Sequence, residues 1–216
     1  MFTALLACLT SLTTDVKAQK NNEKETEFKY VIDEFADIKV MRYQIPGWEE
    51  LSLSQQEYLY YLSEAAKCGR DILWDQNYKY NLTVRRTLEN ILSSFTDKRE
   101  TKEWAEFEVY AKRVFFSNGI HHHYSEDKIM PTFTKDYFKS LIKASSPNTF
   151  PINKGEKMEQ LAARITDIIF NAKIATVRKK ADKTKDIVAN SAVNFYEGVT
   201  SEEAKKFYNN QVSPDE

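Results

Sequence analysis

The residues of this chain best suited to chemistry form one run of histidines. His121, His122 and His123 are the three histidines of the sequence, and they lie within FFSNGIHHHYSEDK, residues 115–128. Imidazole can hold a metal ion, move a proton or activate a nucleophile near neutral pH. The run therefore allows three interpretations: a zinc site, a catalytic base, or a polar loop without catalytic function.

The spacing of the histidines disfavours a dedicated zinc site. Catalytic zinc sites often take two histidines from one helical face, as in H-E-x-x-H, and this sequence lacks that motif. Consecutive histidines point about 100° apart on a helix and to alternate faces on a strand. They cannot all reach one ion from regular structure, so the spacing favours a polar loop after a helix, held by its aromatic neighbours.

Signatures of other catalytic sites are also missing from the sequence. It contains neither a G-x-S-x-G nucleophile elbow nor a Gly-rich phosphate-binding pattern. Ser117, Ser125 and Asp127 flank the histidines, but any polar loop offers such combinations. Asn81-Leu82-Thr83 matches a glycan acceptor, and its place within a helical pattern favours a coincidental match. The basic run RKKADKTK, residues 178–185, is typical of a solvated face.

The composition indicates a globular, mostly helical protein. Its 216 residues suffice for one large domain or two small ones, and 42% of them are hydrophobic. The 31 basic and 32 acidic residues give a net charge of −1, which disfavours nucleic acid as a partner. Five glycines and five prolines favour helices over β structure with many turns.

The N-terminal residues predict an export signal and a leader. The apolar run from Phe2 to Leu12 is too short to span a membrane, and Val16-Lys17-Ala18 offers small residues for cleavage. We expect a signal peptide over 1–18 and a periplasmic or cell-envelope location. A basic n-region is missing, and a cytoplasmic location is the alternative. Residues 19–35 are charged and predict a flexible leader.

The two cysteines do not predict a disulfide. Cys8 lies in the export signal, within a poor lipobox, so cleavage after Ala18 would leave Cys68 alone. Cys68 ends an apolar helical pattern next to Gly69, which predicts a small, buried, apolar side chain. Stability would then come from packing.

The hydrophobic pattern predicts a mainly α fold of about six helices with minor β structure. Ser54–Glu57 has the spacing of a capping box and begins a helix that stops at Gly69. Helical periodicity recurs over 71–95, 102–116, 134–144, 156–170 and 201–210. Thr200–Glu203 repeats the capping-box spacing, and residues 171–192 have room for a β excursion. We expect the aromatic stripes to form core, including the stripe of Tyr58, Leu59, Tyr61, Leu62, Ala65 and Ala66.

Three separated segments resemble one known family. They are residues 51–81 (LSLSQQEYLYYLSEAAKCGRDILWDQNYKYN), 107–142 (FEVYAKRVFFSNGIHHHYSEDKIMPTFTKDYFKSLI) and 190–208 (NSAVNFYEGVTSEEAKKFY). In this order, over roughly residues 36 to 212, they resemble the N-terminal part of dipeptidyl peptidase III in its Bacteroidetes-like form. The most distinctive piece is Phe116–Gly119, followed by Tyr124, Lys128 and Pro131.

The resemblance implies a zinc exopeptidase that releases dipeptides from peptide N-termini. Members of the family have two lobes around a wide cleft and bind peptide in an extended pose. Their zinc motif, H-E-x-x-G-H, and a further glutamate ligand lie in the other lobe and match nothing in this sequence. The resemblance thus implies that 36–216 is the helical N-terminal part of one lobe, with no catalytic or metal residue and no activity of its own. The partners it implies are the C-terminal zinc lobe and a peptide substrate.

For the histidine loop, the resemblance implies a role in the packing of the lobe or the rim of the substrate cleft. The residues concerned are Asn118, Gly119, His121, His122, His123 and Tyr124. Two alternatives stay open. One is a stand-alone helical module that binds peptides or has a structural role, and the other is a small metalloenzyme that would carry stoichiometric zinc.

Overall fold

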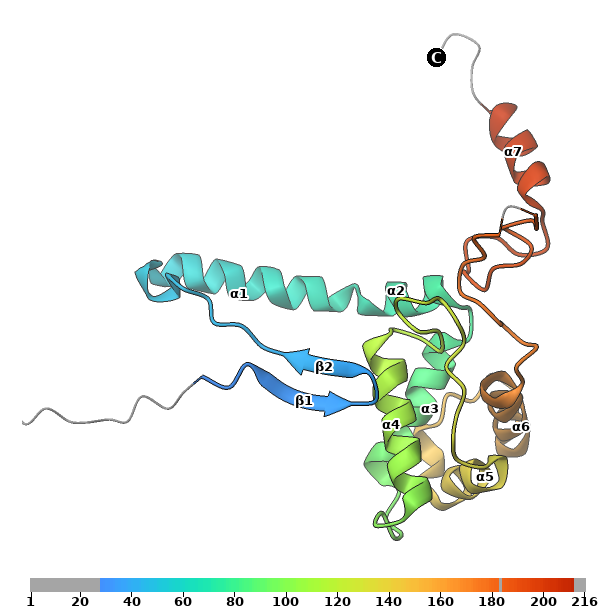
Figure 1. The fold of residues 1–216 in the computed structure, drawn as a ribbon, viewed down its shortest axis with the longest axis horizontal. Coiled ribbons are helices and arrows are strands. Elements are labelled where there is room, and N and C mark those ends of the chain that lie inside the picture. Colours follow the sequence, from blue (N-terminus) through green and yellow to red (C-terminus); the bar gives the residue numbers. More distant parts are fainter. Residues whose placement is uncertain (1–27, 183, 212–216) are drawn as a thin grey trace, which may run out of the picture.

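A computed structural model describes residues 28–182 and 184–211, so the signal peptide predicted over 1–18 lies outside the described residues. Figure 1 shows a helical body from which a β-hairpin, a long helix and a C-terminal helix project. The order of elements is β1 (Val31–Phe35), β2 (Ile38–Met41), η1 (Trp48–Glu50), α1 (Leu53–Cys68), α2 (Arg70–Asn77), α3 (Asn81–Ser94), α4 (Lys102–Phe116), α5 (Lys135–Ala144), η2 (Pro147–Thr149), α6 (Met158–Phe170) and α7 (Ser201–Asn209). The prediction of a mainly α fold with minor β structure is confirmed.

The two strands form an antiparallel hairpin in a region expected to be partly flexible. β1 and β2 pair from Phe35 opposite Ile38 to Val31 opposite Met41. Ala36 takes a φ of 49° in the turn, as two-residue hairpin turns require. The prediction of a flexible leader over 19–35 is therefore wrong for Val31–Phe35, which form β1. Five residues that alternate in burial carry too little periodic signal to identify a strand from the sequence.

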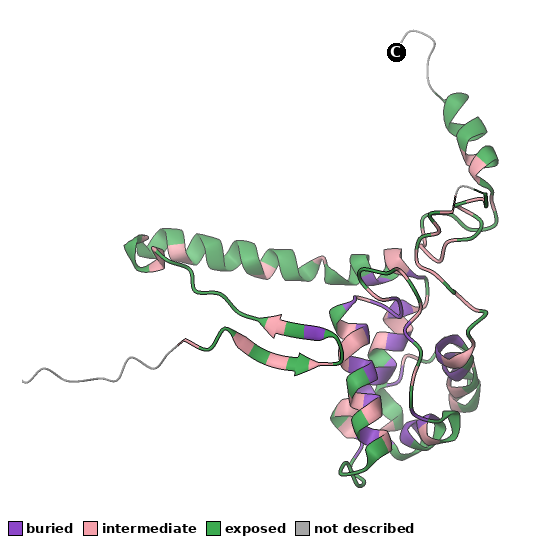
Figure 2. Ribbon diagram, viewed as in Figure 1, coloured by how far each residue is buried: buried purple, intermediate pink, exposed green. Residues whose placement is uncertain are grey.

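Helix α1 is the clearest departure from expectation. It begins at Leu53, because Ser52 caps it: the Ser52 hydroxyl accepts from the Gln55 backbone N–H, and the Ser52 backbone N–H donates to the Gln55 side chain. The capping box predicted at Ser54–Glu57 is therefore wrong. The helix is described over its full length and buries no side chain. The stripe expected to be core lies in solvent, and Cys68, expected to be buried, is exposed. No other described element packs across this face (Figure 2).

The core lies between α3, α4, α5 and α6, where the buried residues gather in Figure 2. Helix α4 spans the predicted range, with Thr101 accepting a hydrogen bond from the Trp104 backbone. Trp104 stacks on Phe95 with ring centroids 5.1 Å apart, and Phe107 packs edge-on to Phe133 at 5.6 Å. The first contact joins α4 to the end of α3, and the second joins it to the segment before α5 and so limits where the intervening histidine loop runs.

The last helix follows its predicted start. Thr200 caps α7 and forms a capping box with Glu203, which confirms the predicted spacing. Between α6 and α7 the described residues are irregular, and among them the predicted β excursion amounts to one isolated bridge, Asp127 to Val177. Over residues 28–182 and 184–211, no helix combines the length and the apolar character needed to cross a membrane.

The histidine loop and the groove beside it

The histidine loop is fixed at its start by a buried asparagine. Asn118 and Gly119 follow α4 with φ values of 51° and 151°. The Asn81 side chain, fully buried, donates from Nδ2 to the Trp74 carbonyl and accepts at Oδ1 from the Ile120 backbone N–H, each at 3.1 Å. A Cβ added at Gly119 would collide with the Asn81 amide. This position therefore needs glycine for both its conformation and its close approach.

Asn81 is a residue whose role the sequence did not indicate. Asn81-Leu82-Thr83 matches a glycan acceptor, but the Asn81 amide is buried and both of its polar atoms are bonded within the protein. The sequence offered one signal: a polar residue at the first position of one helix, together with Asn-Gly at the end of another helix. The partner lies 39 residues away, so the spacing alone could not identify it.

Short extended segments lie side by side around the loop. The Ile129 backbone N–H donates to the Ile120 carbonyl and the His122 N–H to Asp127, both at 2.8 Å. On the other side, the Arg178 N–H donates to the Glu126 carbonyl at 2.8 Å. The segment around 176–178 thus lies against the returning arm of the loop, which holds the loop to the irregular stretch after α6.

His121 is buried, with 1% of its surface exposed. Its Nε2 lies 2.7 Å from the Ala175 carbonyl, and because a carbonyl can only accept, Nε2 carries the proton. Nδ1 then presents a lone pair that finds no partner among the described residues. Burial lowers the pKa of His121 to about 4, so the ring is neutral near pH 7. His121 pins the segment after α6 to the loop.

His122 has both ring nitrogens engaged. Nδ1 accepts the backbone N–H groups of Tyr124 and Ser125 at 3.3 and 3.1 Å, so the proton resides on Nε2. Nε2 donates to Asp37 Oδ2 at 3.2 Å, in the turn of the β-hairpin. Arg113 Nη2 lies 3.5 Å from the other oxygen of Asp37. His122 thereby forms the turn of the loop and contacts the hairpin.

His123 differs from its two neighbours because its ring is exposed. It packs edge-on to Phe116 with a centroid distance of 4.9 Å and lies 4.5 Å from the His122 ring. Partial burial, followed by the neighbouring His122, lowers the pKa of His123. Tyr124 beside it is 87% exposed. Of the six predicted site residues, His123 and Tyr124 are thus the two that present side chains to solvent.

The three imidazoles do not fit a zinc ion. His121 Nε2 and both ring nitrogens of His122 are engaged in hydrogen bonds with Ala175, with Asp37 and with the backbone of the loop. Within the described part of the chain, no group of three or more His, Cys, Asp or Glu side chains could hold a metal ion.

Two charged residues tie the loop to the stretch after α6. Lys128 Nζ donates to the carbonyls of Asn171 and Ile174 at 2.7 and 2.9 Å, and its burial lowers the pKa to about 8. Arg178 forms a bidentate pair with Glu126 at 2.6 and 2.7 Å, which lowers the pKa of that carboxyl. The loop is consequently a structural junction between α4, the hairpin and residues 171–178.

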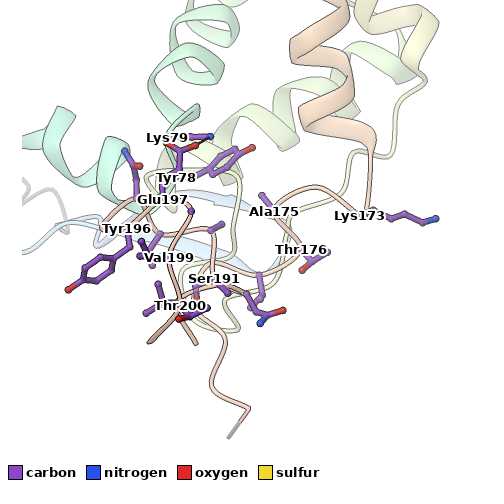
Figure 3. A pocket seen from close by; sticks show the side chains of 18 residues that line it. Tyr78, Lys79, Lys173, Ala175, Thr176, Ser191, Tyr196, Glu197, Val199 and Thr200 are labelled. Atoms are coloured by element: carbon purple, nitrogen blue, oxygen red, sulfur yellow. Dashed lines mark hydrogen bonds and ion pairs between the residues drawn. The ribbon is translucent and has the colours of Figure 1, made fainter. Parts of the chain in front are cut away.

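A groove of about 570 Å³ lies beside this junction, between the corner that joins α2 to α3 and the segment 188–200. Figure 3 shows Tyr78, Tyr196 and Thr200 among its lining residues, while the Lys173 side chain points away from them. Burial raises the pKa of Tyr78 to about 12, so its hydroxyl stays protonated near neutral pH. Lys79 and Glu197 form an ion pair at the groove.

The predicted site residues do not line this groove. Of the residues described, its lining includes none of the six named in the histidine loop. His122 instead lines a separate depression with Asp37, Arg113 and Ser125. The groove residues Tyr78 and Tyr196 were absent from the sequence-based candidates, because nothing in their spacing distinguishes them from core aromatics.

Comparison of this chain with protein-family models and with curated proteins finds no match.

Proposed function

We propose that this chain is the N-terminal part of a zinc-dependent dipeptidyl peptidase and has no activity by itself. The proposal starts from the three segments that resemble dipeptidyl peptidase III. The observation that carries it is the use of the histidines, because His121 Nε2 and both ring nitrogens of His122 form hydrogen bonds that hold the fold. Under this proposal, the chain supplies a structural support, and the reacting groups lie in the other lobe of the enzyme.

Under this proposal the chain positions groups and the other lobe holds the zinc. Zinc, when bound there, would supply activation of a water molecule and polarisation of the scissile carbonyl. In this chain, Asn81 and Gly119 set the start of the histidine loop, and the Arg178–Glu126 pair holds its return. His123 and Tyr124 are then placed at a surface where a cleft rim could form.

A second candidate is a stand-alone helical module that binds peptides. The groove between Tyr78 and residues 188–200 favours it, since its volume falls within the range of ligand sites. The backbone around Glu197 and Gly198 bends past the groove, which gives the site polar main-chain groups as well as aromatic walls.

Reading the coding DNA past codon 216 and assaying both products tests the first proposal. We expect an H-E-x-x-G-H motif downstream, and we expect the product of the whole frame to hydrolyse dipeptidyl arylamides. A chelator should abolish that hydrolysis and zinc should restore it, while the 216-residue chain should be inactive. Hydrolysis by the 216-residue chain itself, or a frame without the motif, would contradict the proposal.

Calorimetric titration of the 216-residue chain with short peptides tests the second candidate. Binding that Tyr196→Ala weakens and Tyr124→Ala leaves unchanged would support the groove as a peptide site, because Tyr196 lines it and Tyr124 does not. Unchanged binding in both variants would exclude the groove.

We also propose export to the periplasm or cell envelope, with the cytoplasm as the alternative. The support is the apolar run Phe2–Leu12 and the small residues that end at Ala18. Mass spectrometry of the protein from its native cells should find Gln19 as the first residue. A mature protein that retains Met1 would favour the cytoplasm.

A further inference from the structure

Helices α1 and α2 form one nearly continuous arm, residues 53–77. Gly69 between them has φ −78° and ψ −4°, which is close to helical, and Figure 1 shows the two helices following one another away from the body. Trp74, 1% exposed, anchors α2 in the core. The rest of the arm extends beyond the helical body.

The arm has a broad apolar face that lies in solvent. Successive side chains of a helix are about 100° apart around its axis, so the apolar side chains of α1, from Tyr61 at one edge to Leu59 at the other, span an arc of about 160°. An apolar arc of this width is typical of a surface helix that packs against a core. Ile72 and Leu73 extend this face along α2, opposite Trp74. The exposed members are Tyr58 (65%), Leu59 (42%), Tyr61 (68%), Leu62 (47%), Ile72 (60%) and Leu73 (51%).

The apolar face is large enough for a docking surface. A helical arm of this length extends about 37 Å, and an arc of about 160° along it has an area of roughly 500 Å². Contiguous apolar patches of this size on soluble proteins commonly mark sites of interaction. One helical face of a partner, laid lengthwise, would cover it.

The charges of the arm indicate what kind of partner fits. Acidic residues outnumber basic ones along it and at its start, the former being Glu49, Glu50, Glu57, Glu64, Asp71 and Asp75 and the latter Lys67 and Arg70. Glu57 and Glu64, seven residues apart, fall on one stripe beside the apolar face. Glu64 also pairs with Lys67, whereas Glu57 forms no ion pair with another described residue. Two antiparallel copies of this arm would bring their acidic stripes together and repel one another, whereas a face flanked by Lys or Arg would be complementary.

We infer that the arm docks lengthwise on an apolar helical surface flanked by basic side chains, in the part of the peptidase outside this chain. The identity of that partner rests on the proposed function, while the chemistry of the surface rests on the arm alone. The arm thus joins the two parts of the protein in the manner of a helix laid into a groove.

Binding of synthetic peptides to the 216-residue chain tests the chemistry of the surface. The probes are two amphipathic helical peptides of about 18 residues, one of leucine and lysine and one of leucine and glutamate. We expect the lysine peptide to bind at least about tenfold more tightly and to slow amide exchange in α1. Leu62→Glu should weaken this binding about tenfold, while Ser63→Glu, which adds the same charge to the polar face, should not.

Equal binding of both peptides, or binding that Leu62→Glu leaves unchanged, would overturn the inference. So would a dimer of the 216-residue chain in sedimentation that Leu62→Glu abolishes, since the occupant would then be a second copy.

Amide exchange in the product of the whole reading frame identifies the partner. We expect α1 to exchange about a hundredfold more slowly there than in the 216-residue chain. If that product is a zinc peptidase but α1 exchanges equally fast, the docking inference fails and the proposed function stands. If the frame lacks a zinc motif while the lysine peptide binds as expected, the proposed function fails and the docking surface stands.

Discussion

Helices α1 and α4 have nearly the same length and a similar pattern of aromatic residues, but opposite surroundings. α1 has 16 residues and α4 has 15, and each repeats large apolar side chains at helical intervals. In α4 the stripe is buried, its members being Trp104, Phe107, Tyr110, Ala111 and Val114. In α1, which is described throughout, the equivalent stripe lies in solvent.

This difference separates two kinds of information in an amphipathic pattern. The pattern states that one face of a helix is apolar, and both helices obey it. It does not state which surface covers that face, because the covering elements are distant in sequence. Helix α4 packs against Phe133 and Phe95 of the same chain, whereas the apolar face of α1 packs against no such partner among the described residues.

The largest expected effect tests the comparison directly. Phe107→Ala should lower the free energy of unfolding by about 3–5 kcal/mol, since it removes a fully buried ring and leaves a cavity. Tyr61→Ala should change it by less than about 0.5 kcal/mol, because that ring is 68% exposed. Urea unfolding followed by circular dichroism measures both. A loss of several kcal/mol for Tyr61→Ala would mean that α1 is covered in solution.

The junction between the body and the histidine loop gives the next effect. Gly119→Ala should cost about 2–3 kcal/mol, because the new Cβ meets the buried Asn81 amide and φ is 151°. Gly155→Ala is a matched control, since its φ is 82° and no atom lies within 4 Å of the added Cβ. It should cost only about 1 kcal/mol of backbone strain. Equal losses in thermal unfolding would show that backbone conformation alone decides the cost.

Much of the fold could be predicted from the sequence where the information is local. The range of α4, the start of α5 near Thr134 and the capping box of α7 are set by neighbouring residues, and all three are confirmed. The start of α1 was wrong by two residues because Ser52 and Ser54 offer similar caps. Choosing between them requires the backbone geometry that only the fold provides.

The histidine loop could be located from the sequence but not understood from it. Each ring takes its role from a distant partner: Ala175 lies 54 residues from His121, and Asp37 lies 85 residues from His122. Sequence spacing carries no trace of such contacts. The same limit applies to Asn81, whose contact with Ile120 explains the glycine beside it.

A pH titration compares a buried histidine of the body with an exposed one. The pKa of His121 falls from 6.5 to about 4 on folding, so the unfolded chain binds a proton first. The stability that the neutral ring contributes is complete above pH 6.5 and is lost as the pH falls toward 4, by about 3 kcal/mol. Urea midpoints between pH 7 and 4 should therefore fall less steeply in His121→Gln than in the wild type.

His123→Gln is the control for that titration, because its ring is exposed. We expect its unfolding to follow the wild-type pH dependence closely, with carboxylates accounting for the remaining acid sensitivity. If His121→Gln showed the wild-type slope as well, the buried imidazole would not be the source of the difference.

The smallest effect concerns the hairpin, whose burial is intermediate between that of α1 and that of the helical body. Ile38 is its buried apolar side chain, and ion pairs join it to α4, with Lys112 Nζ 2.9 Å from Asp33 and Arg113 Nη2 3.5 Å from Asp37. Such exposed pairs contribute about 1 kcal/mol or less and weaken with salt. Asp37→Asn should therefore speed amide exchange in β1 and β2 severalfold at low salt, with α4 unchanged.

Glu34→Gln is its matched control, because Glu34 pairs with Lys39 within the hairpin, at 3.7 Å, rather than with the body. Raising the salt concentration to about 0.5 M should bring the wild-type hairpin to the exchange rate of Asp37→Asn, since screening acts on the same pairs. Exchange that neither salt nor Asp37→Asn changes would place the attachment in the packing of Ile38, and the hairpin would then belong with the body. Salt-sensitive exchange would instead group it with α1 as an element that the described core holds weakly.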